Sequence, residues 1–239
     1  MSLVITLCVR EGIVMASDSR MTLNATRQEA DKQIVQLAVG QSDSNYKTFL
    51  APCKVGISTF GAADVQGTPI AGYIESFMNE KLVDNSFEVD QIPPMILEYF
   101  RNLPGPPETG FFVAGYKTIE KTSEQQLWEV FTKENKIARL NKPGRQGASW
   151  MGESDILIRL LQPVYLKDES GNFQPVSHHQ IQWGFFTLQD AIDYAIFSIK
   201  VTIDAMRFHP RPKTVGGPID VLVIKPNEAF WVQKKGLHG

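Results

Sequence analysis

The chain has few cysteines, little net charge and no long apolar run. Among its 239 residues only Cys8 and Cys53 are cysteines, and each lies inside an apolar segment. This does not resemble a disulfide framework, so we expect two buried thiols in a reducing compartment, the cytoplasm. No segment approaches the roughly 18 consecutive apolar residues that cross a bilayer. The opening residues also lack a basic segment followed by an apolar one, which disfavours secretion and membrane insertion.

The charge pattern disfavours two further kinds of site. Net charge is -2 and the lysines and arginines are scattered, whereas nucleic-acid surfaces need clustered basic side chains. His178 and His179 are adjacent, but no cysteine or acid stands nearby at ligand spacing, so we interpret them as part of a polar loop. We expect Trp150, Trp183 and Trp231 in the core or at interfaces.

The composition is that of one globular domain. Apolar residues make up 43% of the chain and charged residues 21%, which is ordinary for a protein that buries a sizeable core. No repeat or low-complexity tract is present, and the proline-rich pieces at 104–107 and 209–212 are too short to be domain linkers. We therefore expect a single domain over residues 1–239.

Apolar runs separated by turn residues predict mostly antiparallel strands. We expect an opening hairpin, a second hairpin, a three-stranded meander and a closing hairpin, and we interpret the polar stretch 20–46 as an elaborated loop. The expected strands are Leu3–Val9, Ile13–Ala16, Lys47–Ala51, Val55–Thr59, Gly110–Tyr116, Gln126–Thr132, Ile137–Leu140, Ile219–Ile224 and Phe230–Val232.

Three segments carry the three-to-four-residue spacing of a helix. The first has Ile70, Ile74, Phe77 and Met78 on one stripe. The second is opened by Pro93-Pro94 and has Ile96, Leu97, Phe100 and Leu103 as its apolar face. The third, Leu188–Met206, gives the strongest signal in the chain. Strands, two helices, strands, helices and strands, joined by short connections, favour antiparallel sheets with helices outside.

The first twenty residues, MSLVITLCVREGIVMASDSR, resemble the opening of proteasome β subunits and of the bacterial HslV-type ring proteases. In that family a nucleophile at the mature N-terminus leads a strand, a glycine turn and a second strand ending in Asp-Ser-Arg. On this pattern Ser2 takes the nucleophile position, Gly12 the turn, Asp18 the buried acid and Arg20 the following arginine.

Two further blocks extend the resemblance. YKTFLAPCKVGISTFGAADVQG resembles the family segment in which a catalytic lysine starts a strand and a glycine opens the first helix, which places Lys47 and Gly61 at those positions. The helix end Thr202-Ile203-Asp204 and the strand entry VGGPIDVLVI resemble the family's closing helix, its acid and its Ser-Gly-Gly strand. The loop between Asp18 and Lys47 is longer than usual.

The chain departs from the family at three places. The nucleophile is serine where threonine is usual. The family's Gly-Ser-Gly segment is represented by Trp150-Met151-Gly152-Glu153-Ser154, either with glutamate where serine is expected or with the serine displaced by one. Val215 stands where the family has a supporting serine, and the segment FHPRPKTV is inserted between Asp204 and Gly216.

The resemblance implies an α+β fold, a four-layer αββα sandwich of two antiparallel sheets flanked by helices, as in N-terminal-nucleophile hydrolases. It implies that the Ser2 hydroxyl attacks an amide with the α-amine as base, once Met1 is removed. Lys47 would favour the alkoxide-like form, Asp18 would hold Lys47, and the Gly61 N–H would bind the oxyanion. Asp204 would be the supporting acid. No metal or cofactor is implied.

The same resemblance implies a threonine/serine-type endopeptidase in a homo-oligomeric ring, acting on peptides or unfolded proteins with an ATP-dependent unfoldase as partner. Two alternatives stay open: a catalytically silent structural subunit of the same fold, and a small-molecule amidase. Individual residues have alternatives too. Ser2 could belong to an unprocessed or cloning-derived leader, and Asp18 with Lys47 could be a structural ion pair. Asp204 could be a solvated acid at a helix end.

Overall fold

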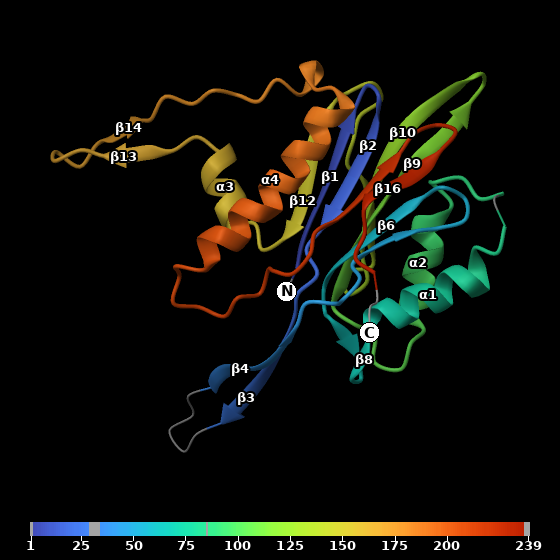
Figure 1. Cartoon of the computed structure of the whole chain (residues 1–239), viewed down its shortest axis with the longest axis horizontal. Coiled ribbons are helices and arrows are strands. Elements are labelled where there is room, and N and C mark those ends of the chain that lie inside the picture. The colour runs from blue at the N-terminus through green and yellow to red at the C-terminus, as the bar shows by residue number, and fades with distance from the viewer. Residues whose placement is uncertain (1, 29–33, 85, 237–239) are drawn as a thin grey trace.

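Two five-stranded antiparallel sheets form the centre of the protein (Figure 1). The computed structural model describes residues 2–28, 34–84 and 86–236. The first sheet has the strand order β12-β1-β2-β15-β16, and the second β11-β10-β9-β6-β5. The strands of the first are β1 (Leu3–Val9), β2 (Gly12–Ser17), β12 (Gly147–Gly152), β15 (Asp220–Ile224) and β16 (Ala229–Gln233); those of the second are β5 (Thr48–Leu50), β6 (Gly56–Gly61), β9 (Thr109–Ile119), β10 (Thr122–Phe131) and β11 (Lys136–Arg139).

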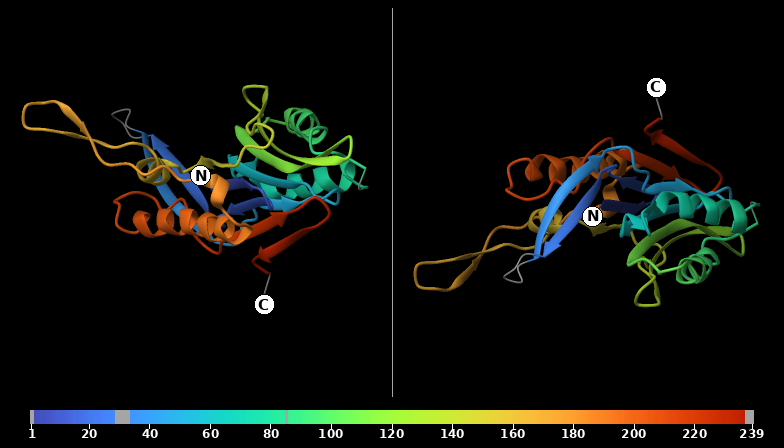
Figure 2. Two further views of the ribbon diagram at one scale, coloured as in Figure 1. Left: turned by 90° about the horizontal axis from the view of Figure 1, so that it is seen from above. Right: turned by 90° about the horizontal axis from the view of Figure 1, so that it is seen from below.

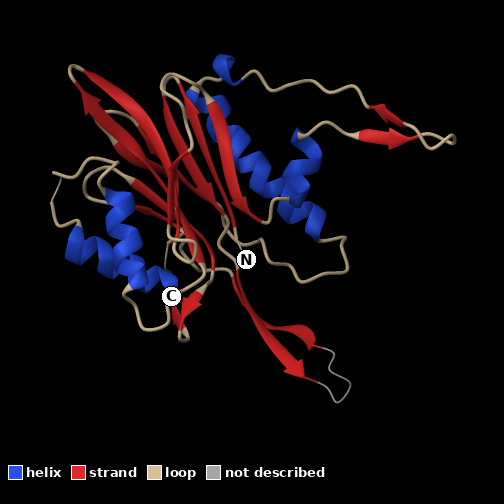
Figure 3. Cartoon of the chain, turned by 180° about the vertical axis from the view of Figure 1, so that it is seen from behind, coloured by secondary structure: helices blue, strands red, loops and turns tan. Residues whose placement is uncertain are grey.

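Four α-helices occur in the described part of the chain: α1 (Ile70–Lys81), α2 (Ile92–Arg101), α3 (Asp155–Leu161) and α4 (Leu188–Met206). Helix α4 begins at a capping box, in which the Asp190 N–H donates to the Thr187 hydroxyl and the Thr187 N–H donates to the Asp190 carboxylate. At its other end the Lys213 ammonium donates to the carbonyls of Met206 and His209. Colouring by secondary structure shows helices at the outside and strands between them (Figure 3).

Alternation along β1 explains how the layers pack. Its odd residues Leu3, Ile5 and Leu7 pack with α4 residues such as Ala195 and Ile199, because successive side chains of a strand point to opposite faces. The even residues Val4 and Cys8 pack with side chains of β6, β9 and β10. All of β1 and β2 is buried. The first sheet is therefore covered on one face by a helix and on the other by the second sheet.

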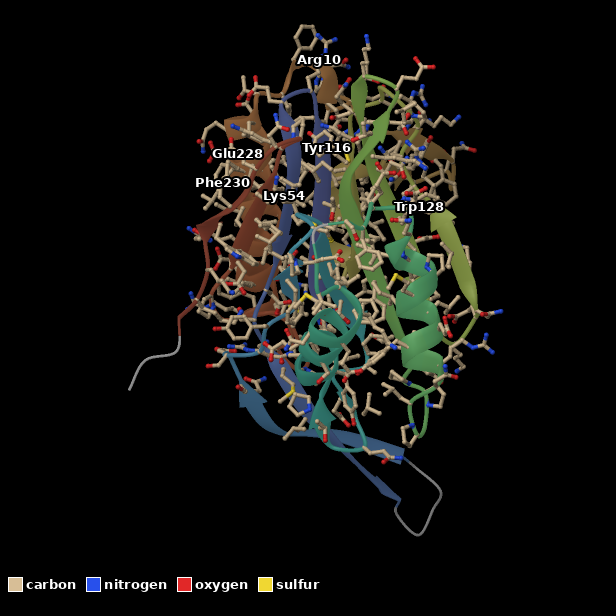
Figure 4. The ribbon with its side chains drawn as sticks, turned by 90° about the vertical axis from the view of Figure 1, so that its right-hand side faces the viewer. Arg10, Lys54, Tyr116, Trp128, Glu228 and Phe230 are labelled. Atoms are coloured by element: carbon tan, nitrogen blue, oxygen red, sulfur yellow. The ribbon has the colours of Figure 1, made fainter. Side chains whose placement is uncertain are left out.

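The second sheet is covered in the same way on its outer face. Ile57 of β6 and Phe111 of β9 pack with Ile74 of α1 and Phe100 of α2. Views from above and below show the two sheets side by side with a helix layer beyond each (Figure 2). Figure 4 shows Tyr116 between the two sheets, whereas Phe230 lies on β16, at the edge of the first sheet.

Most predicted elements are confirmed, including the opening hairpin, the meander, the closing hairpin and the helix Leu188–Met206. The loop prediction for 20–46 is wrong. Strands β3 (Met21–Gln28) and β4 (Ile34–Ser42) pair with each other alone and project from the body as a ribbon (Figure 1). Apolar residues, such as those at 34–39, are mixed with polar ones in this stretch without a clear strand period, so its composition resembled that of a loop.

Several elements had no prediction. Strand β12, helix α3 and the short 3-10 helix Trp183–Phe185 lie in segments without a clear period. Two small hairpins, β7 (Asp64–Val65) with β8 (Thr68–Pro69) and β13 (Tyr165–Lys167) with β14 (Phe173–Pro175), are each two-stranded sheets. The second forms an arm that extends away from α3 and α4 (Figure 1).

The two thiols and the histidine pair differ in exposure. Cys8 is buried, and burial raises the pKa of its thiol to about 12. Cys53 is free but only partly buried, which corrects the expectation of two buried thiols. His178 and His179 are exposed in a loop, and the described residues hold no group of three or more potential metal ligands. No described helix is long and apolar enough to cross a membrane.

A substitution at Phe112 tests how much the packing between the two sheets contributes to the free energy of unfolding. Phe112 is 1% exposed and packs edge to face against Phe60 at 5.3 Å between ring centroids. Phe112→Ala should lower the free energy of unfolding by about 3–5 kcal/mol, because it leaves a cavity between the sheets. Denaturant unfolding measures this. The control Phe185→Ala removes a ring that is 85% exposed and should change the value by less than about 0.5 kcal/mol; equal losses would contradict this packing.

Candidate active site

The Asp18 carboxylate is the centre of the candidate site. Asp18 follows β2 directly and is fully buried. Its Oδ1 accepts the Leu3 N–H at 2.9 Å and the Lys47 Nζ at 2.6 Å. Its Oδ2 accepts the Gly216 N–H at 3.0 Å and the Arg20 N–H at 3.1 Å. Four donors from four segments thus surround one buried anion, and a buried charge needs such partners.

Lys47 reaches Asp18 from the other sheet. It precedes β5, its side chain is 2% exposed, and its Nζ also donates to the Arg20 carbonyl at 2.7 Å. Burial lowers the pKa of the Lys47 ammonium, while the charge of Asp18 and its hydrogen bond oppose that effect. The expected pairing of Asp18 with Lys47 is therefore seen in the structure, whereas the expected hydrogen-bonding reach of the Ser2 hydroxyl to this pair is not among the described hydrogen bonds.

A chain of hydroxyl groups runs beside this ion pair. The Thr48 Oγ1 donates to the Ser17 Oγ at 2.9 Å and lies 2.9 Å from the Ser58 Oγ. All three side chains are buried. Because Ser17 belongs to the first sheet and the others to the second, these hydrogen bonds fix the position of Lys47 relative to Asp18.

Ser2 lies next to the ion pair and is 8% exposed. It adjoins Leu3, whose amide binds Asp18, and its carbonyl accepts the Glu153 N–H at 2.8 Å. Within the described residues the Ser2 hydroxyl makes no hydrogen bond to Asp18 or Lys47. Met1 lies outside the described residues. The structure thus brings Ser2 to the site through its backbone.

Gly152 is required by the close approach of β12 to Ser2. Its φ is +99°, and a Cβ built on it would lie 1.7 Å from the Ser2 carbonyl oxygen. Only glycine adopts this conformation without strain. The segment 150–154 therefore contacts the backbone of Ser2 through Gly152 and Glu153.

Glu153 and the inserted segment meet in space. Arg211 of the FHPRPKTV insertion donates from NH1 to Glu153 Oε2 at 3.3 Å and from NH2 to both oxygens of Asp155 at 3.1 and 3.2 Å. Asp155 is the first residue of α3. Glu153 and the inserted segment, which are two departures from the family pattern, are thus joined by an ion pair. Glu153 in turn bonds the Ser2 carbonyl through its backbone.

Arg20 forms a salt bridge at the rim of the site. Its Nε and NH2 bind the two oxygens of Asp43 at 2.6 and 2.7 Å, and this hydrogen bonding lowers the pKa of the Asp43 carboxyl. A Cβ on Gly216 would lie 2.4 Å from the Arg20 Cζ, so the guanidinium rests against Gly216. The structure thus gives Arg20 an ion-pairing role, and Asp43 is a partner that sequence reasoning missed.

The other predicted site residues are placed differently. Gly61 ends β6 with φ +98°, and a Cβ there would lie 2.7 Å from the Glu108 carbonyl oxygen. The β7–β8 hairpin separates it from α1, so the expectation that it opens the helix is wrong. Asp204 is exposed on α4, and its side chain makes no contact with Asp18 or Lys47 among the described hydrogen bonds. Its position is that of a solvated acid near a helix end.

Comparison with known proteins supports the fold. The features to compare are two packed antiparallel sheets with helices outside, and an acid and a lysine buried beside the first strand. Neither known protein families nor curated proteins give a match by sequence. Among solved structures the chain matches "Anbu (Gly-1) mutant from Hyphomicrobium sp. strain MC1" at TM-score 0.56 and 15% identity, over 98% of this chain and 86% of that one. This likeness shows the fold alone.

The Asp18–Lys47 pair should behave as a coupled unit. Lys47→Met leaves a buried carboxylate without its cation and should lower the free energy of unfolding by about 3–5 kcal/mol. Combining it with Asp18→Asn should cost less than the sum of the two single changes, with a coupling energy of about 2 kcal/mol in a double-mutant cycle. The exposed pair Lys225–Glu228 is the control and should couple by less than about 1 kcal/mol. Additive effects at Asp18 and Lys47 would contradict the ion pair.

Gly152→Ala should displace Ser2. The added methyl group meets the Ser2 carbonyl, so we expect a loss of more than about 2 kcal/mol in denaturant unfolding. Gly144 is the matched control, because it also has positive φ but open space around the added Cβ. Gly144→Ala should lose only about 1 kcal/mol, the conformational cost alone. Equal losses would show that β12 does not press on Ser2.

Proposed function

We propose that the protein is a proteasome-type N-terminal-nucleophile amide hydrolase, with residues 1–239 as one four-layer αββα domain. The observation that carries this proposal is the buried Asp18–Lys47 pair, bonded directly to the strand that begins beside Ser2. Holding a lysine 2% exposed away from water is costly for folding alone. An arrangement of this kind is expected where the lysine acts on a neighbouring hydroxyl.

The proposed reaction is acyl transfer through Ser2. After removal of Met1, the Ser2 hydroxyl attacks the amide carbonyl carbon while its proton passes to the α-amine of the same residue. The tetrahedral intermediate collapses, the C–N bond breaks, and the leaving amine takes up the proton. Water then attacks the ester, which releases the acid and restores the Ser2 hydroxyl. No metal or cofactor takes part in these steps.

The neighbouring groups have distinct roles in this proposal. The Lys47 ammonium favours the alkoxide-like form of Ser2 by its charge, and Asp18 holds Lys47 in place. The Gly61 N–H remains our proposed oxyanion donor. We do not assign a step to Asp204, because its side chain is exposed.

We further propose a peptide or unfolded-protein substrate and a homo-oligomeric ring of serine/threonine-type peptidase subunits, fed by an ATP-dependent unfoldase. Support comes from the β13–β14 arm, on which the apolar side chains Tyr165 at 57%, Leu166 at 63% and Phe173 at 69% are exposed together. Exposed apolar side chains in number are typical of association surfaces.

A second candidate is a catalytically silent structural subunit of the same fold. One observation favours it: Glu153 replaces the expected serine and is held by Arg211 at 3.3 Å. The Ser2 hydroxyl also makes no hydrogen bond to Lys47 among the described residues. Under this hypothesis the ion pair and the Glu153–Arg211 contact are structural.

Covalent labelling distinguishes the two candidates. We expect untagged, natively expressed protein that has lost Met1 to gain the mass of one adduct when treated with a peptide epoxyketone or β-lactone, because these reagents acylate or alkylate N-terminal hydroxyl nucleophiles. Intact-mass spectrometry measures it. Ser2→Ala should abolish the adduct, and Lys47→Arg, which keeps the charge but changes its position, should slow its formation at least about tenfold. No adduct on a Met1-free chain would favour the silent subunit.

A further inference from the structure

A second buried ion pair lies beside the first. Asp220 is fully buried at the start of β15, and the Lys235 side chain is 7% exposed. The Lys235 ammonium binds Asp220 Oδ2, and the Lys235 backbone N–H donates to Asp220 Oδ1 at 2.8 Å. Nothing in the acyl-transfer mechanism uses this pair, although burying two charges is as demanding here as at Asp18 and Lys47.

Tyr46 connects this pair to the candidate active site. Its hydroxyl donates to the Lys235 carbonyl at 3.2 Å, and the Lys235 Nζ lies 4.4 Å from its ring centroid, within cation–π range. Tyr46 is the residue before Lys47. Four contacts of Lys235, two with Asp220 and two with the Tyr46 side chain, therefore fix the chain at the residue before Lys47.

Asp220 makes the corresponding connection on the first sheet. In the β15–β2 ladder it lies opposite Ser17, the residue before Asp18. Asp220 thus pairs with the residue before Asp18, and Lys235 contacts the residue before Lys47. Displacing the second pair must move or reorient the first.

The charges around Lys47 come from every element that packs on it. Asp18 and Asp43 favour its protonated form, whereas Lys235 disfavours it, and burial is the largest effect, lowering its pKa. Asp220 binds Lys235 and Arg20 binds Asp43, so each of these two outer charges has an ion-pair partner of its own. Lys235 is therefore the cation that acts against the charge of Lys47.

We propose that Lys235, held by Asp220 and Tyr46, is a positioning residue for Lys47: it fixes the 46–47 segment and opposes the positive charge on the Lys47 ammonium. Its importance for catalysis rests on the proposed hydrolase function, whereas its effect on Lys47 does not. A cation that opposes Lys47 makes proton release from Lys47 easier, which suits a lysine that assists a hydroxyl nucleophile.

The experiment follows the Lys47 titration directly. Full-length protein labelled with [13Cε]lysine is titrated by NMR, and the Lys47 resonance is assigned by its loss in Lys47→Arg. Lys235→Met removes the opposing cation and should raise the midpoint by about one pH unit. Asp220→Asn leaves that cation without its anion and should lower the midpoint by a similar amount. The double variant, which removes both charges, should return towards the wild-type value.

Two conservative variants control for a purely structural role. Lys235→Arg keeps the charge and should keep the midpoint, whereas Lys225→Met removes a surface lysine of the same hairpin, paired with Glu228, and should not change it. If Lys235→Met does not fold, the Asp220→Asn and Lys235→Arg titrations still decide. Midpoints that stay fixed, or that move in the same direction for Lys235→Met and Asp220→Asn, would overturn the proposal.

A parallel measurement separates this inference from the hydrolase proposal. The pH profile of Ser2 acylation by the β-lactone should shift with the Lys47 midpoint in each variant. Opposite NMR shifts without any acylation of Ser2 would support the role of Lys235 and contradict the hydrolase function. Acylation with a profile that Lys235→Met leaves unchanged would support the hydrolase and contradict the role of Lys235.

Discussion

The structure depends on satisfying one buried carboxylate. Asp18 draws hydrogen bonds from the Leu3, Arg20 and Gly216 amides and from the Lys47 ammonium. These donors lie in the first strand, after the second strand, before β15 and before β5. A buried anion that lost one of them would be left with an uncompensated charge. The geometry of Asp18 therefore constrains how the two sheets, and the segments that enter them, meet.

Apolar packing provides the frame for this polar centre. Three clusters, one on each side of the sheets and one between them, hold β1 and β2 completely out of water. In such a frame the hydroxyl chain through Ser17, Thr48 and Ser58 and the two buried lysines can be positioned tightly, because the low local polarity strengthens their hydrogen bonds. The same low polarity lowers the pKa of Lys47.

The helices and hairpins whose signals lie within one stretch of sequence were predicted correctly. The helix Leu188–Met206 has its apolar spacing and its capping box within the segment itself, and the first hairpin has its turn. The pairing of Asp18 with Lys47 was predicted from the resemblance of two sequence blocks, one around each residue, to the proteasome β-subunit family. Arg211 with Glu153 and Lys235 with Asp220 join residues far apart in the chain, so no window of sequence contains both partners. Asp220 did carry a signal, an acid opening a fully apolar strand. Strands β3 and β4 were missed because apolar and polar residues are mixed along them without a clear alternation.

The candidate site is built from both ends of the chain, and this has a consequence for synthesis. Strand β2 pairs with β15, and Asp18 needs the Gly216 amide, although these residues leave the ribosome nearly two hundred positions apart. Until the C-terminal third has emerged, β2 lacks a neighbour on one edge and the Asp18 carboxylate lacks a donor. The nascent chain thus holds Ser2 and Lys47 long before it can assemble the site around them. A site of this kind can form only after the residues of β15 have been synthesised, whatever was made before them.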